Sequence, residues 1–177
     1  MSITAVNPVS GRKIKDYTEH NAQQVAEKIA QTHQAWLSWK ETTHDERSRL
    51  LNNMAKVLRD RNQELAILMA EEMGKPIRQG HDEIEKCAVC CEHYARNAEH
   101  FLTDRPVNTE ASKTFITFQP IGVVLAVMPW NFPFWQVFRF LAPALAAGNC
   151  GGQQPHHQQR TELHRGQTVH CRKLRPR

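Results

Sequence analysis

The stretch Ile121-Gly-Val-Val-Leu-Ala-Val-Met-Pro-Trp-Asn-Phe-Pro133 decides the fold class of this 177-residue chain. Its first eight residues are almost continuously apolar and rich in Val. This composition is typical of a strand covered on both faces, as in a parallel α/β sheet. Two prolines then bound a loop, and residues 134–147 have the pattern of a helix that stops at Gly148-Asn149. The stretch therefore predicts a strand, a loop and a helix of the α/β class.

Amphipathic helices are expected before this unit. Apolar residues recur at helical spacing in residues 21–40, 43–73 and 77–102. Asn21 can cap the first helix, and Thr43 with Glu46 has the spacing of a capping box for the second. We expect an interruption near residues 60–62 and an end at Gly74, which can supply a left-handed residue. The N-terminal part is thus predicted to be mainly helical.

The positive charge of the chain lies in its last 28 residues. Residues 1–149 hold 17 Lys or Arg and 17 Asp or Glu, whereas residues 150–177 hold six and one. These last residues also hold four His and five Gln, with little apolar periodicity. Such a segment buries too little surface to offset about 1–2 kcal/mol of backbone entropy per residue. We therefore expect no second strand and a disordered basic tail from about residue 151.

The composition gives no membrane or secretion signal. No apolar run reaches the roughly 18 residues of a membrane span, and residues 1–9 lack the features of a signal peptide. The cysteine count is five, and Cys87, Cys90 and Cys91 fall on one predicted helix, which is a poor disulfide framework. The sequence therefore predicts a cytoplasmic protein without a membrane partner.

Four segments carry a resemblance to a known family. The Pro129-Trp-Asn-Phe-Pro133 loop, the Asn7-Pro8 turn with Gly11, the segment Glu72-Met-Gly-Lys-Pro76 and the helix end Pro143-Ala-Leu-Ala-Ala-Gly-Asn149 occur in the same order as in the aldehyde dehydrogenase superfamily. The chain resembles that family over about residues 4–150. Within that family, the sequence of residues 128–137 looks most like that of bacterial succinate-semialdehyde dehydrogenases.

The resemblance implies a domain organisation. Members of the family have a Rossmann-like NAD(P)-binding domain, a catalytic domain and an oligomerisation hairpin, and they form homo-oligomers. Residues 1–150 would then be a partial NAD(P)-binding domain with an incomplete oligomerisation arm near residues 107–119, where Thr114–Phe118 has the pattern of a strand. Residues 151–177 would be a non-homologous tail.

The resemblance also implies site residues. In the family a cysteine thiolate attacks an aldehyde, donors stabilise the oxyanion, hydride passes to the nicotinamide of NAD or NADP, and a glutamate assists hydrolysis. Asn131 matches the oxyanion-stabilising asparagine, and Val127, Met128, Pro129 and Trp130 match the strand end that lines the cofactor. As alternatives, Asn131 closes a turn, and Trp130 is a core aromatic residue.

The remaining catalytic groups of the family have no match in this sequence. No segment resembles the nucleophilic cysteine, the glutamate base or the cofactor-contacting lysine that follows the Gly-Asn pair. Cys171 lies in the basic tail, where nothing would lower its pKa or hold it near Asn131. We therefore predict that the chain alone is inactive, and its binding of NAD or NADP is in doubt. A reading-frame shift or truncation near codon 150 would explain why family match, charge balance and periodicity are lost together.

Three other interpretations deserve comparison. A metal site could use Cys87, Cys90 and His93, but structural zinc pairs usually sit on tight turns and a second pair is absent from the sequence. The basic tail could bind nucleic acid, but it lacks interleaved aromatic residues. A non-catalytic fragment could associate with full-length subunits through the 107–119 arm or an open strand edge. We expect neither a metal nor a nucleic-acid partner.

Overall fold

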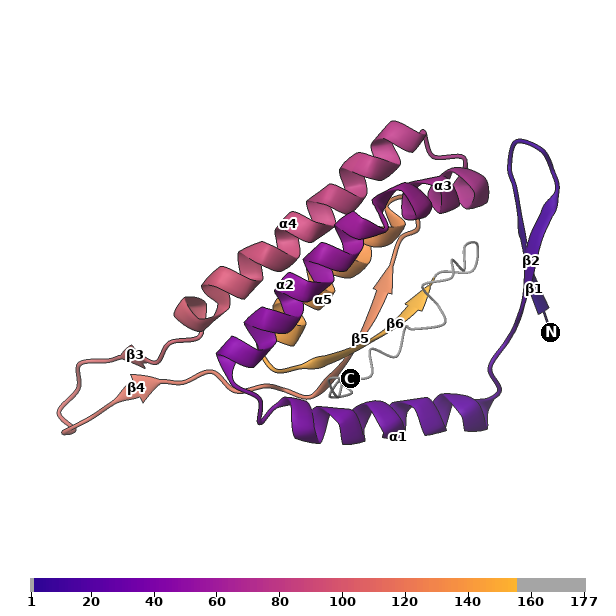
Figure 1. Ribbon diagram of the computed structural model, residues 1–177. Coiled ribbons are helices and arrows are strands. Elements are labelled where there is room, and N and C mark those ends of the chain that lie inside the picture. The colour runs from indigo at the N-terminus through magenta and orange to yellow at the C-terminus, as the bar shows by residue number, and fades with distance from the viewer. Residues whose placement is uncertain (1, 156–177) are drawn as a thin grey trace, which may run out of the picture.

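The computed structural model describes residues 2–155 and places them in five helices and six strands (Figure 1). The strands are β1 (Ser2–Val6), β2 (Lys13–Thr18), β3 (Arg105–Pro106), β4 (Phe115–Ile116), β5 (Val123–Met128) and β6 (Cys150–Pro155). The helices are α1 (Ala22–Trp39), α2 (His44–Asp60), α3 (Asn62–Met73), α4 (Ile77–Phe101) and α5 (Pro133–Ala146). Within the described residues the strands form three separate pairs, of which β1–β2 and β3–β4 are antiparallel and β5–β6 is parallel.

The predicted helix ends are confirmed. Asn21 Oδ1 accepts a hydrogen bond from the backbone N–H of Gln24 at 2.8 Å, and the Gln24 side chain accepts from the Asn21 N–H at 3.0 Å. Thr43 Oγ1 accepts from the Glu46 N–H at 3.2 Å, but within residues 2–155 the Glu46 side chain does not return a bond to the Thr43 N–H, so only half of the expected capping box forms. One residue separates α2 from α3, and Gly74 ends α3 in the left-handed conformation with φ 71°. Local sequence therefore sets where these helices begin and end.

The main core lies where α2, α4 and α5 pack together. Figure 1 shows these three helices side by side, and α3 crosses the end of the group. Phe134, Met69 and Ile84 are among the largest fully buried side chains. Six residues of the apolar stripe expected on α4 are buried: Ile84, Cys87, Ala88, Cys91, Ala95 and Ala98. Of the other two, Tyr94 is partly buried, and Phe101 at the helix end is 44% exposed, where the prediction is wrong. The bundle therefore rests on the 3.6-residue period of α4.

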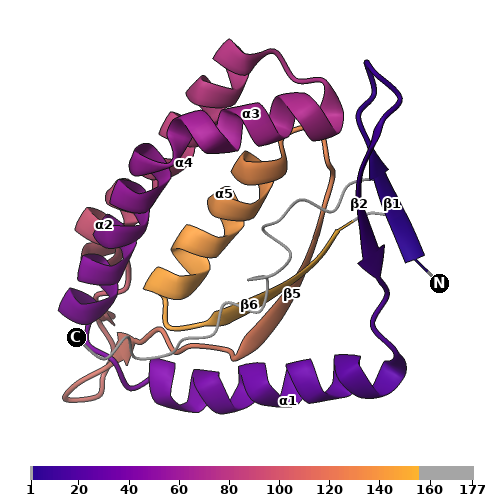
Figure 2. The ribbon, with the colours of Figure 1, turned by 45° about the vertical axis from the view of Figure 1, so that its right-hand side comes forward.

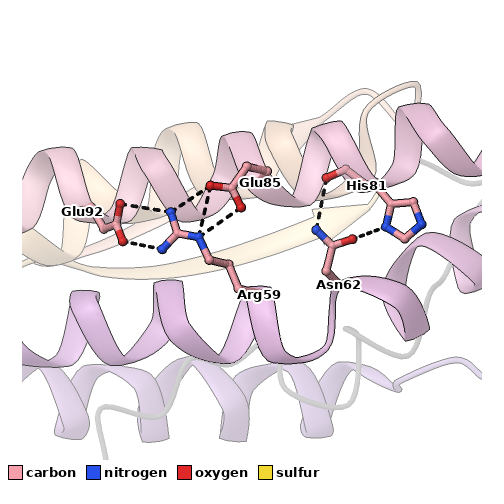
Figure 3. Close-up of polar contacts among 5 residues, drawn as sticks. All are labelled: Arg59, Asn62, His81, Glu85 and Glu92. Atoms are coloured by element: carbon pink, nitrogen blue, oxygen red, sulfur yellow. Dashed lines mark hydrogen bonds and ion pairs between the residues drawn. The ribbon is translucent and has the colours of Figure 1, made fainter.

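Polar contacts join α2 and α3 to α4 along the rim of this bundle (Figure 3). The Arg59 guanidinium donates to the carboxylates of Glu85 and Glu92, with Nε at 3.0 Å from Glu85 Oε2 and Nη2 at 3.1 Å from Glu92 Oε2. Asn62 Nδ2 donates to the backbone oxygen of His81 at 3.2 Å, and the Asn62 side-chain oxygen also contacts His81 Nδ1. Because these groups are partly exposed, solvent screens their contacts, and they contribute less to stability than the apolar core beneath them.

The strand, loop and helix predicted from the opening stretch are confirmed as β5, a loop and α5. The β5–α5–β6 unit is a parallel βαβ arrangement, with α5 on one side of the two strands and α1 on the other (Figure 2). Asn149 Oδ1 accepts from the backbone N–H groups of Ile121 at 2.7 Å and Gly122 at 3.2 Å, and the Cys150 N–H donates to the Gly122 oxygen at 3.1 Å. The α/β fold class follows from this unit.

A buried arginine holds the carboxyl-terminal end of α5. Arg47 Nη1 donates to the Ala146 oxygen at 3.1 Å, and Nη2 donates to the Thr42 oxygen at 2.7 Å and to the Lys40 oxygen at 3.2 Å. The side chain is buried, and this burial lowers the pKa of Arg47. Arg47 thus joins the α1–α2 connection to the helix end that leads into β6.

The prediction that no second strand follows α5 is wrong. Residues 150–155 form β6, which pairs in parallel with β5 from Val123 opposite Cys150 to Met128 opposite Pro155. The prediction relied on apolar side chains, whereas strand pairing uses backbone N–H and C=O groups that polar residues also possess. Cys150 anchors the start of β6 because it is fully buried against Trp39, Leu141 and Leu145. Residues 156–177, to which the rest of the predicted basic tail belongs, lie outside the described residues.

The prediction that the 121–128 strand is covered on both faces is also wrong within residues 2–155. Ala126 is buried, but Val123, Leu125 and Val127 are 37%, 65% and 57% exposed. These three alternate residues share one face of β5, because side chains alternate across a strand. Val124, Ala126 and Met128, on the opposite face, are partly or fully buried. One face of β5 is therefore covered, whereas the face that carries Leu125 and Val127 is open along most of its length. An apolar run predicts that both faces of a strand are buried, but it does not tell which residues pack against each face.

The predicted arm is an extended excursion between α4 and β5. β4 is shorter than the expected 114–118 strand and pairs with β3 through Arg105 opposite Ile116. The Val107 N–H donates to the Thr114 oxygen at 2.9 Å and extends the pairing. Figure 1 shows this hairpin reaching away from the helices, and Phe115 and Ile116 are exposed. No helix among residues 2–155 is both long enough and apolar enough to cross a membrane.

Candidate active-site loop

The candidate site is the loop that joins β5 to α5. It lies at the carboxyl end of β5, the end of an open α/β sheet at which ligands bind. Trp130 and Phe132 are 45% and 44% exposed, and Asn131 is also exposed. The loop therefore presents an amide between two aromatic side chains to the surface of the described chain. Such a surface can donate a hydrogen bond beside an apolar contact.

The expected cofactor-lining residues lie close together in sequence but not on one surface. Val127 and Met128 end β5, and Pro129 and Trp130 begin the loop. Val127 is 57% exposed, whereas Met128 is partly buried, because consecutive strand residues point to opposite faces. The alternative that Trp130 is a core aromatic residue is not supported among residues 2–155, where almost half of its surface is exposed.

Within residues 2–155, the backbone of Asn131 accepts a hydrogen bond and its side chain makes none. Its side-chain amide makes no hydrogen bond within residues 2–155, whereas its backbone oxygen accepts from Lys75 Nζ at 3.4 Å. An asparagine that closes a turn would use its side-chain oxygen for a nearby backbone N–H, as Asn7 does for Val9 and Ser10. The observed geometry instead leaves the Asn131 amide available for a ligand.

Two residues that sequence reasoning did not assign to the site hold this loop. Lys75 and Glu83 form an ion pair whose side chains are only 4% and 2% exposed. Glu83 Oε1 accepts from the backbone N–H groups of Phe134 and Trp135, each at 2.9 Å. Lys75 belongs to the Glu72–Pro76 segment already noted in the sequence, so a signal for it was present. Glu83 has no comparable signal, since it lies among charged residues on a helix.

The three thiols on α4 are not activated as nucleophiles. Burial raises the pKa of Cys87 far above its ordinary value, raises that of Cys91 to about 12, and also raises that of Cys90. All three side chains lie on α4 rather than beside Asn131, and Cys90 Sγ lies 3.8 Å from the Phe138 oxygen. The potential metal ligands Cys87, Cys90 and His93 do not assemble into a group of three in the part of the chain that the structure describes. Cys171 lies outside the described residues.

Comparison with known proteins identifies the class of this fold and site. The model of the aldehyde dehydrogenase family matches residues 1–160, and the chain belongs to that family. It is 46% identical over 151 residues to a probable succinate-semialdehyde dehydrogenase [NADP(+)] of Synechocystis sp., covering 85% of this chain and 33% of the relative. It is 42% identical over 154 residues to a succinate-semialdehyde dehydrogenase [NADP(+)] of Mycobacterium leprae, covering 85% and 34%.

Solved structures agree with this assignment. Succinic semialdehyde dehydrogenase from Streptococcus pyogenes, in complex with NADP+, superposes with a TM-score of 0.83 at 28% identity, covering 88% of this chain and 34% of that one. An aldehyde dehydrogenase from Brucella melitensis biovar abortus superposes with a TM-score of 0.84 at 27% identity, covering 89% and 33%. The chain therefore spans about a third of the length of the relatives that it matches.

Proposed function

We propose that this chain is the N-terminal part of a succinate-semialdehyde dehydrogenase that uses NADP+, and that Asn131 stabilises the oxyanion of its reaction. The observation that carries the proposal is the exposed Asn131 amide at the carboxyl end of β5, which makes no hydrogen bond within residues 2–155. A donor of this kind stabilises negative charge on the aldehyde oxygen after a nucleophile has added to the carbonyl carbon. The Asn131 backbone oxygen accepts a hydrogen bond from Lys75 Nζ at 3.4 Å, so the chain that carries the amide is held on one side.

The cofactor assignment rests on the same end of β5 and on the relatives. NADP+ appears in the names of both curated relatives and in the Streptococcus pyogenes complex. In the chain described here, Val127, Pro129 and Trp130 offer exposed apolar surface that fits a flat ring or a sugar, and Met128 completes the strand end from its opposite face. We propose these four residues as cofactor contacts. When bound, the cofactor would accept hydride from the aldehyde carbon.

We further propose that the 177-residue chain has no dehydrogenase activity by itself. The reaction needs a thiolate within bonding distance of the carbonyl held by Asn131. Cys87, Cys90 and Cys91 cannot supply it, because all three lie on α4 and burial raises the pKa of each thiol. Cys150 cannot supply it either, because it is fully buried at the start of β6, opposite Val123 at the other end of β5 from the loop. The test is to incubate the purified chain with succinate semialdehyde and NADP+ or NAD+ and to follow absorbance at the wavelength of the reduced cofactor. Turnover that scales with chain concentration would refute this proposal.

The role of Asn131 needs a catalytically complete partner. Residues 1–149 can be joined to the remainder of the Synechocystis relative at the equivalent of Gly148-Asn149, which gives a chimeric enzyme with this chain's loop. Asn131→Ala in the chimera should lower kcat about 10²–10³-fold with a smaller change in KM. Asn53→Ala is the matched control, because it removes an exposed amide from α2. Equal kcat values for the two variants would refute the oxyanion role.

A second candidate is a non-catalytic fragment that associates with full-length subunits. It is favoured by the open face of β5 at Leu125 and Val127 and by the exposed arm residues Phe115 and Ile116. Exposed apolar surfaces of this kind mark contact sites or cause aggregation. Size-exclusion chromatography with light scattering, with and without the full-length relative, distinguishes mixed oligomers from a monomer. If the chain stays a monomer and does not bind the full-length relative, this second candidate function is refuted.

A further inference from the structure

Lys75 and Glu83 form a buried ion pair whose desolvation cost is hard to explain if the pair only stabilises the fold. Both side chains are almost completely buried, at 4% and 2% exposure. Removing two charges from water carries a large desolvation cost, which their attraction repays only with good geometry and further hydrogen bonds. Those further bonds all go to one segment, the end of the active-site loop and the first turn of α5. The position of that segment is therefore what the pair determines.

Glu83 supplies a cap that α5 lacks in its own sequence. The N-cap residue of α5 is Phe132, whose side chain makes no capping hydrogen bond, and Pro133 has no backbone N–H. The next two N–H groups, of Phe134 and Trp135, would be unpaired at a helix start. One oxygen of the Glu83 carboxylate accepts both at 2.9 Å, and its charge complements the positive end of the helix.

Lys75 connects the same carboxylate to the loop. It lies between α3 and α4, beside the left-handed Gly74, and its ammonium contacts the second Glu83 oxygen. The same ammonium donates to the Asn131 backbone oxygen at 3.4 Å and lies 4.0 Å from the centre of the Phe132 ring. The pair is thus hydrogen-bonded to the backbone at Asn131 and, three and four residues later, at Phe134 and Trp135.

We propose that Lys75 and Glu83 are positioning residues that fix the direction of the Asn131 side-chain amide. This inference rests on the oxyanion role proposed above. Asn131 is exposed, so packing around its side chain does little to orient it, and the orientation must come from its backbone. A buried charge pair acting on that backbone is stiff, because neither partner can turn to water without leaving the other unpaired. A displacement of about 1 Å in a reacting group can cost about a hundredfold in rate.

The first test needs no activity and uses the unaltered 177-residue chain. The N–H groups of Phe134 and Trp135 belong to a first helical turn, where amides normally exchange with solvent quickly. If Glu83 accepts from both, hydrogen exchange measured by NMR should be slowed at these two positions by about a hundredfold or more relative to unprotected amides. Exchange at the unprotected rate would overturn the proposal, whether or not any variant folds.

The second test compares Glu83→Gln with Glu85→Gln, a matched control two residues along the same helix with an exposed carboxylate. Glu83→Gln keeps an acceptor oxygen but removes the charge, so exchange at Phe134 and Trp135 should become about tenfold faster. The Asn131 side-chain NH₂ resonances should shift or broaden, and Glu85→Gln should leave both signals unchanged. If Glu83→Gln does not fold, the double variant Lys75→Met/Glu83→Gln removes both charges together, and the same changes in exchange and resonances are expected.

A stabilising pair without a positioning role gives a different result. In that case the Glu83→Gln or double variant unfolds at lower denaturant, while the Asn131 NH₂ resonances stay where they are. That outcome overturns the proposal. It leaves the oxyanion role untouched, because the chimera experiment with Asn131→Ala tests that role separately. Conversely, moved resonances together with an active Asn131→Ala chimera would refute the oxyanion role and retain the structural connection.

Discussion

Gly148 is the glycine whose replacement should be most damaging, because two separate physical costs meet there. It follows α5 with φ 81°, and a Cβ atom built on it would lie 2.8 Å from Pro120 Cγ and 3.0 Å from Arg47 Nη1. A left-handed backbone costs an L-residue about 1–2 kcal/mol, and overpacking a tight site costs about 1–3 kcal/mol. Alanine also restricts the unfolded chain, which returns about 0.4–1 kcal/mol. Gly148→Ala should therefore lower the free energy of unfolding by about 1–4.5 kcal/mol.

Gly74 provides a matched control. It ends α3 with φ 71°, and the nearest atom to its added Cβ is Pro8 Cγ at 3.3 Å. Pro8 lies in an exposed turn and can move slightly, whereas Arg47 at Gly148 is buried and held by hydrogen bonds to backbone oxygens. Gly74→Ala should therefore show little beyond the backbone cost, about 1 kcal/mol.

The assay is equilibrium unfolding of the 177-residue chain in urea, followed by tryptophan fluorescence and by far-ultraviolet circular dichroism. The two probes must agree if unfolding is two-state. Adding Pro120→Ala to Gly148→Ala removes the nearest clashing atom and should recover part of the loss. Equal losses for Gly74→Ala and Gly148→Ala, or no recovery in the double variant, would refute the reasoning from close packing.

Three further predictions concern side chains elsewhere in the described chain. Arg47→Met should cost about 2–4 kcal/mol of unfolding free energy in urea, because buried carbonyl oxygens lose their donors, whereas the exposed Arg49→Met should change it by less than about 0.5 kcal/mol. Cys91, whose pKa burial raises to about 12, should resist iodoacetamide at pH 8 in the native chain and react in denaturant, as peptide mapping would show; native labelling would contradict the burial. Hydrogen bonding to Arg59 lowers the pKa of Glu92 from its ordinary 4.5, so the stability it contributes is present above that pH and is lost as pH falls through the lowered pKa. Arg59→Met should therefore flatten the pH dependence of unfolding below about pH 4.5, and an unchanged slope would count against the contact.

Features set by neighbouring residues could be predicted from the sequence. The Asn21 and Thr43 caps and the Gly74 stop each depend on residues within four positions, so their spacing is visible along the chain. The buried stripe of α4 follows the 3.6-residue period in the same way. In α1 the period is present but misleading about burial, since Val25 and Ile29 are 38% and 60% exposed while Thr32 is buried. Periodicity identifies a helix more reliably than it identifies which elements cover it.

Features set by distant backbone groups could not be predicted from the sequence. β6 pairs through N–H and C=O groups, so its Gly and Gln residues carry no apolar alternation to reveal it. The open face of β5 depends on which elements pack against it, and an apolar run gives only the need for cover. The same limit applies to the site. The loop motif identified Asn131. Glu83 could not be identified in this way, because it lies 51 residues from Phe134, whose N–H donates a hydrogen bond to it.

The loop motif is short because its residues serve a ligand, whereas residues outside it, Lys75 and Glu83, hold its backbone in place. The side chain of Asn131 must remain unbonded to serve a ligand, so the loop cannot use it to hold itself in place. Its aromatic neighbours are about half exposed, so their packing against the rest of the described chain is incomplete. Support therefore has to come from outside the motif, and a buried carboxylate with an ammonium partner provides directional bonds that apolar packing cannot. The residues that orient a reactive amide are therefore expected to contact the first free N–H groups of the following helix rather than the loop itself.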